Sequence, residues 1–128
     1  MNGTMEVMNG GRTLVFPVKA GQKITEGMIV AIKEGYAIAG AKTTGAITVG
    51  VAVEPADNTN GADGGIEITV KRGAFKILNS SVNPVTQADV FKTAYFVDAY
   101  TVTAIGTGSS AVGKILSLDG EDVIVEIM

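Results

Sequence analysis

The chain contains no histidine, no cysteine and no tryptophan. Histidine is the side chain most often used for proton transfer near neutral pH, and cysteine supplies thiol nucleophiles, disulfides and soft-metal ligands. Their absence removes the usual catalytic triads, thiolate metal sites and disulfide bonds, so stability has to come from apolar burial or from association. These exclusions favour a scaffold over an enzyme, and we expect neither catalysis nor a metal or other cofactor.

Basic charge is also scarce. The 128 residues include 10 Lys and Arg against 13 Asp and Glu, which gives a net charge of −3. The basic residues are scattered along the sequence, and this argues against direct binding of nucleic acid or of an anionic membrane. The first ten residues lack the basic and apolar regions of a signal peptide, and no apolar run approaches the roughly 20 residues of a membrane span. We therefore expect synthesis in the cytoplasm.

Glycine and β-branched residues are abundant instead. The chain has 17 Gly together with 16 Val, 12 Ile and 13 Thr, a composition that suits short strands and tight turns. Apolar Ile66, Ile68 and Val70 alternate with polar neighbours, which is the pattern of a strand with one buried face. Similar segments are residues 13–18, 28–33, 36–39, 46–54, 74–78, 94–98, 100–104, 112–118 and 123–127.

About eight to ten short strands in one small chain predict an all-β fold. An open sheet of this size would leave long edges free to pair with other chains, so we expect a small closed or partly open β-barrel, or a sandwich. Asp119-Gly120 predicts a hairpin with a type I′ turn, and Glu34-Gly35 and Asp98-Ala99 predict two smaller hairpins. Residues 86–91 form the single predicted helix, of one or two turns, because Pro84 blocks an earlier start.

The two halves of the sequence resemble each other. Each has a hairpin, a Gly/Thr/Ser-rich link, a Val-Gly strand and a return strand, and Gly50 and Gly113 fall at matching points. A glycine there would let a strand bend sharply at a barrel corner or bulge. The pattern indicates one unit used twice, and the alternative is a chance match between β-rich segments.

Two segments carry polar groups that could form a site. The loop 54–65 contains Asp57, Asn58, Asn60 and Asp63, but their spacing does not follow a known calcium loop, and we expect a solvated turn. Adjacent Lys71 and Arg72 could contact a phosphate. We expect no basic patch there, because neighbouring residues of a strand point to opposite faces.

The N-terminal segment differs from the rest of the chain. We divide the sequence into an arm, residues 1–11, and a single β-barrel domain, residues 12–128. Met5, Val7 and Met8 give the arm apolar groups without periodicity, which suits either a frayed terminus or a segment that orders on a partner. On the second interpretation these three residues would contact a neighbour or partner, and so would Arg12 and Phe16, which mark where the arm meets the barrel.

A resemblance to biotinyl and lipoyl carrier domains is limited to the segment 21–27 and the strand after it. Those domains need a lysine at an exposed hairpin tip, and the Asp119-Gly120 tip has none. The wider sequence resembles small phage head-decoration proteins, also called capsid cement proteins. The resemblance is carried in order by residues 18–32, 48–54, 66–75, 94–98, 112–116 and 123–127.

This resemblance implies a small β-barrel that sits, commonly as a homotrimer, on the exterior of an assembled phage capsid. The implied partner is the major capsid protein, and the implied location is the virion, with the host cytoplasm during assembly. The family carries no catalytic residues. The alternative hypothesis is a ligand- or glycan-binding β-module on a virion or cell surface, although three Tyr, four Phe and no Trp offer little surface for sugar stacking.

Overall fold

The computed structural model describes residues 12–128, and Met5, Val7 and Met8 lie outside that range. The first half of the described chain contains seven strands: β1 (Thr13–Pro17), β2 (Lys23–Ile24), β3 (Ile29–Lys33), β4 (Tyr36–Ala39), β5 (Ile47–Ala52), β6 (Ala56–Asp57) and β7 (Glu67–Lys71). Five of them form one sheet in the order β1-β7-β5-β3-β4. The two-residue strands β2 and β6 pair with each other.

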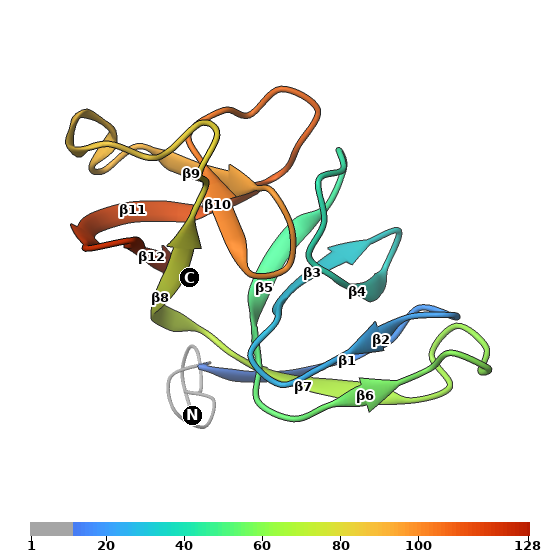
Figure 1. Ribbon diagram of the computed structural model, residues 1–128. Helices are drawn as coiled ribbons and strands as arrows, with labels where there is room; N and C mark the ends of the chain where they lie inside the picture. Colours follow the sequence, from blue (N-terminus) through green and yellow to red (C-terminus); the bar gives the residue numbers. More distant parts are fainter. Residues whose placement is uncertain (1–11) are drawn as a thin grey trace, which may run out of the picture.

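The second half forms a closed barrel of five strands. These are β8 (Gly73–Asn79), β9 (Thr93–Phe96), β10 (Thr101–Thr103), β11 (Ala111–Asp119) and β12 (Asp122–Ile127), with a short 3-10 helix, η2 (Gln87–Asp89), between β8 and β9. The barrel order is β10-β8-β12-β11-β9, and the parallel pairing of β10 with β8 closes it. The predicted all-β barrel is therefore confirmed. Figure 1 shows the two halves as neighbouring lobes.

The two halves have the same strand order. If β1, β7, β5, β3 and β4 are matched in turn to β8, β12, β11, β9 and β10, the neighbours agree throughout. Even the parallel closure has a counterpart, because Val18 and Ala37 form a parallel bridge between the ends of β1 and β4. The predicted duplication is thus confirmed at the level of strand order, and it extends to β1 and β8, which the sequence comparison did not include.

Gly50 and Gly113 occupy equivalent bulges. The register shifts between Val30 and Ala31 where β3 pairs with β5, and again between Ala111 and Gly113 where β11 pairs with β9. A Cβ on Gly50 would lie 2.7 Å from the carbonyl oxygen of Lys71, and one on Gly113 would overlap the carbonyl oxygen of Glu126. Close approach of a neighbouring backbone therefore explains both glycines.

Each half has its own apolar core, but the cores are not independent. Val18, Ile24, Ile68 and Val70 are fully buried in the first core, with Leu14 and Phe16 packed against it. The second core is built around fully buried Phe96, Ile115, Val123 and Val125. It also includes Ile29, Ala31 and Ile38, which β3 and β4 of the first half contribute.

Hydrogen bonds join the two halves at several points. The Ser110 hydroxyl donates to the carbonyl of Thr43 at 2.6 Å and accepts from the backbone N–H of Ala46 at 3.1 Å. The Thr48 hydroxyl donates to the carbonyl of Ala111 at 2.7 Å. Ile29 also donates its N–H to the carbonyl of Ala99. The halves are therefore held by directional contacts as well as by the shared core.

The turns differ from the predictions in detail. Lys33 pairs with Tyr36, and both Glu34 and Gly35 have positive φ (54° and 88°), so this hairpin has the type I′ signature. The predicted hairpin between β11 and β12 is confirmed. The prediction of a type I′ turn at Asp119-Gly120 is wrong. Asp119 pairs with Asp122, which makes Gly120 and Glu121 the turn residues, and only Gly120 has positive φ.

The remaining local predictions are confirmed with small shifts. The hairpin around Asp98 and Ala99 exists, and Asp98 caps its loop by accepting the Tyr100 N–H at 2.8 Å. The predicted short helix is η2, begun by Thr86, whose N–H donates to the Asp89 carboxylate at 2.8 Å. Between residues 12 and 128 no helix has the length and apolar character needed to cross a membrane.

Candidate functional site: the junction cavity

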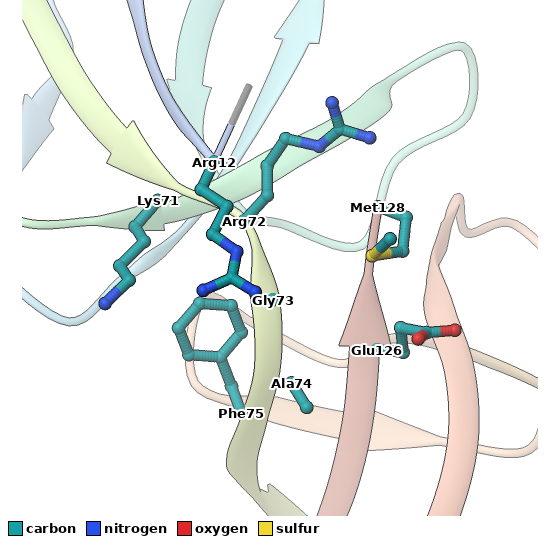
Figure 2. A pocket seen from close by; sticks show the side chains of 8 residues that line it. All are labelled: Arg12, Lys71, Arg72, Gly73, Ala74, Phe75, Glu126 and Met128. Atoms are coloured by element: carbon teal, nitrogen blue, oxygen red, sulfur yellow. The ribbon is translucent and has the colours of Figure 1, made fainter. Parts of the chain in front are cut away.

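A cavity lies at the point where the chain passes from one half to the other. Its volume is about 500 Å³, and we name it the junction cavity. The residues that line it come from β7, β8, β12 and the segment before β1 (Figure 2): Arg12, Lys71, Arg72, Gly73, Ala74, Phe75, Glu126 and Met128. Strand pairing assembles this wall, because β1 pairs with β7 and β12 pairs with β8.

Arg12 and Arg72 are the only two arginines of the chain, and both line this cavity. They are far apart in the sequence, but Thr13 pairs with Lys71, and the Arg72 N–H donates to the carbonyl of Arg12 at 2.6 Å. Neither guanidinium forms an ion pair with another residue in the described range 12–128. The fold therefore gathers both arginines at one place and leaves their charged groups available.

Lys71 and Arg72 diverge, as their adjacency in the sequence predicts, but both line the junction cavity together with Arg12, which was not predicted. Figure 2 shows the two side chains leaving the backbone in different directions, as alternation requires, with Arg12 between them. All three nevertheless line one cavity, because β7 ends at Lys71 and Arg72 lies between strands. The missing signal was the long-range pairing of β1 with β7, which neighbouring residues in the sequence do not reveal.

The charge and polarity of the cavity wall are uneven. The cavity wall includes three cationic residues and, among residues 12–128, one acidic residue, Glu126, although the whole chain has a net charge of −3. Phe75, Ala74 and Met128 supply apolar surface, and the Met128 side chain is 74% exposed. The arrangement can hold a negatively charged group beside an apolar one. In Figure 2 the Arg12 side chain extends toward the Phe75 ring.

An apolar groove shares one lining residue with the junction cavity. Phe75 lines both, and the groove, with a volume of about 590 Å³, runs past Ile29, Val51 and Leu78 to Tyr100. Beyond Leu78 a further hollow includes Val82 and Val97. We define the seam face as the exposed apolar residues beside the β8–β10 pairing: Leu78, Val82, Val97 and Tyr100.

The residues proposed from sequence as partner contacts are placed differently. Arg12 is exposed and lines the junction cavity, where it meets Lys71 and Arg72. Phe16 does not line it, because β1 turns this side chain toward the first core, where it is partly buried. The proposed contacts of Met5, Val7 and Met8 concern residues outside the described range.

The polar loop after β6 is held together by its own side chains. Asn58 is 3% exposed, and its amide donates to the carbonyls of Val18, Lys19 and Ala62 at 3.1, 3.2 and 2.8 Å. The Thr59 hydroxyl and N–H both donate to Asp57, which lowers the pKa of that carboxyl group. Asp63 accepts the N–H of Ala20 at 2.8 Å. These contacts account for the loop as a structural element.

Among residues 12–128, this loop included, no three acidic side chains lie close enough together to hold a metal ion. Comparison with known proteins adds no functional assignment: no family model, no curated protein and no solved structure matches the chain.

Proposed function

We propose that this chain is a virion structural protein that binds the exterior of a phage capsid and stabilises the shell. The proposal rests on the sequence resemblance, on the all-β fold and above all on the seam face. Val82 is 81% exposed, Leu78 53%, Tyr100 43% and Val97 39%. Grouped apolar side chains of this kind usually mark a site of protein association.

The proposed mechanism is multivalent stapling. Each copy would contact the major capsid protein through a small footprint, and a homotrimer would repeat that footprint around a symmetry axis of the shell. Repetition raises the occupancy of a weak contact without requiring a large interface. The role is non-catalytic and requires no direct contact with nucleic acid.

Binding to capsids at two stages of maturation tests the proposal. The purified full chain is mixed at limiting concentration with mature shells and with unexpanded precursors of the same phage, and bound protein is measured after sedimentation. We expect saturable binding to mature shells and little binding to precursors, because expansion creates the lattice of neighbouring coat subunits that the protein would join. Absence of binding to mature shells would reject the proposal.

A pair of variants tests the role of the seam face. Leu78→Asp places a charge among its apolar residues and should lower shell occupancy at least several-fold. Ile47→Asp makes the same change at a side chain that is 71% exposed, on β5 and outside the seam face, so it serves as the matched control. Equal occupancy of both variants and the wild type would show that the seam face is not the contact. Binding to a glycan instead of shells would support the alternative module.

A further inference from the structure

We infer that the junction cavity binds an acidic segment of a protein partner, in which a carboxylate lies next to an apolar side chain. The identification of that partner as the coat protein rests on the proposed function. The inference itself rests on the two arginines, on the surrounding wall and on the apolar groove that shares Phe75 with the cavity.

The arginines carry the chemical part of this inference. A guanidinium presents N–H donors in a planar fork that matches the two oxygens of a carboxylate, and lysine cannot reproduce this geometry. Seven of the eight lysines lie elsewhere, but both arginines and Lys71 line one cavity. Arg72 is partly buried. The hydrogen bond from its backbone N–H to the carbonyl of Arg12 fixes the spacing of the two backbone segments. This preorganisation favours a specific carboxylate contact over diffuse attraction.

The wall beside the arginines selects for a mixed ligand. Phe75 and Met128 offer apolar surface within the same cavity, and Phe75 also lines the groove that leads to Leu78 and Tyr100. An extended segment could therefore place its acidic residue at the arginines and its apolar residues along the groove. Buried apolar surface would add about 25 cal/mol per Å² to the charged contact.

The same geometry disfavours nucleic acid as the occupant. A nucleic-acid backbone needs basic residues spread along a face, because its phosphates repeat regularly. Here the cationic residues gather in one cavity, while the described residues of the neighbouring groove include Asp98, Asp122 and one cation, Lys76. Repulsion from these carboxylates would oppose a polyanion that followed the groove, whereas a short acidic peptide can end at the cavity.

A peptide titration tests the inference without any shell. Fluorescent hexaglutamate is the probe, hexaglutamine is the neutral control, and a short single-stranded oligonucleotide is the third arm. For the wild-type chain we expect binding of hexaglutamate that weakens as NaCl rises from about 50 to about 300 mM. Arg12→Gln with Arg72→Gln should weaken it about tenfold or more, since charge-assisted hydrogen bonds are lost.

Three further variants of the full chain sharpen the result. Lys42→Gln with Lys92→Gln removes the same charge from two exposed positions outside the junction cavity and should leave probe binding unchanged. Arg12→Lys with Arg72→Lys keeps the positive charge but removes the planar guanidinium groups, so its affinity for hexaglutamate should lie between those of the wild type and the Arg→Gln double variant. The same variant replaces the Arg→Gln double variant if the latter fails to fold. Glu6→Gln shows whether the chain's own acidic N-terminal residue competes for the site.

Several outcomes would overturn the inference. These are equal probe binding by wild type and the arginine variants, tighter binding of the oligonucleotide than of hexaglutamate, and a marked gain in affinity for Glu6→Gln, which would make the N-terminal segment the occupant. Shell binding separates this inference from the proposed function. If the wild type binds hexaglutamate but no shells, only the proposed function fails. If it binds shells and the arginine variants bind them equally at all salt concentrations, only the inference fails.

Discussion

At the scale of one residue, the side chain of Asn58 holds the polar loop after β6 against the segment that follows β1. Its buried amide group faces three backbone carbonyls, from Val18, Lys19 and Ala62. A donor is therefore required at this position, and a carboxylate would place negative charge against three acceptors. Sequence reasoning treated Asn58 as one of several solvated oxygen-bearing residues, because nothing local indicates that only this side chain is buried.

Asn58→Asp should consequently be strongly destabilising at neutral pH, by about 3 kcal/mol or more. In the folded state the new carboxyl group should have a pKa above its unfolded value of about 3.9, since only its protonated form can donate. The stability of the variant relative to the wild type should therefore be highest at low pH and fall as pH rises through the folded pKa. Urea unfolding between about pH 3 and 8 measures this. Asn60→Asp, at an exposed position of the same loop, should show neither effect.

The corner glycines give a second prediction for single residues. Gly50→Val and Gly113→Val should each lower the free energy of unfolding by about 3 kcal/mol, because the new side chain would collide with the carbonyl of Lys71 or of Glu126. Ser117→Val, at an exposed position of β11, is the control and should change stability by less than about 0.5 kcal/mol. Neutral effects at both glycines would refute close approach of the neighbouring backbone as the reason for a glycine at each corner.

At the scale of elements, the hairpin of β3 and β4 can be improved. Glu34 has φ of 54° in a two-residue turn, a conformation that asparagine adopts more readily than glutamate. Glu34→Asn should therefore stabilise the protein by roughly 0.5–1 kcal/mol. The comparison variant is Glu121→Asn, in the turn between β11 and β12, where Glu121 does not have positive φ. Thermal unfolding that shows the same gain for both variants would contradict the turn assignment.

Strands were predictable from the sequence because their signal is local. Apolar and β-branched runs mark the ten strands of three or more residues between Thr13 and Ile127, with clear alternation in β7 and β12, and turn residues mark the strand ends. Strands β2 and β6 were not predicted, because a strand of two residues is too short to show a periodic pattern. The turn between β11 and β12 shifted by one residue because β11 extends to Asp119, a pairing decided by register with β12.

The candidate site was predictable only in part, for a related reason. Arg12 was named from its position between arm and barrel, and Lys71 with Arg72 from their charge, but their meeting depends on the register of β1 with β7. A residue's neighbours across a sheet are set by long-range pairing, which composition and spacing do not specify. The packing of Phe16 against the first core likewise depends on long-range pairing and could not be inferred from its neighbours in the sequence.

At the scale of the whole molecule, the shared core should make the two halves unfold together. β3 and β4 belong to the sheet of the first half, yet they contribute Ile29, Ala31 and Ile38 to the core of the second. Unfolding of the first half would therefore expose part of the second core and remove the contacts of Ser110 and Thr48. Such coupling favours a single cooperative transition over two separate ones.

This coupling predicts how core substitutions behave. Ile68→Ala in the first core and Ile115→Ala in the second should each destabilise the protein by about 2–5 kcal/mol, since both side chains are fully buried. Both should shift the same single calorimetric transition, with equal calorimetric and van't Hoff enthalpies. Ile47→Ala, at a largely exposed side chain, should have little effect. Two resolved transitions, of which each substitution moves only one, would instead show that the duplicated halves fold as separate units.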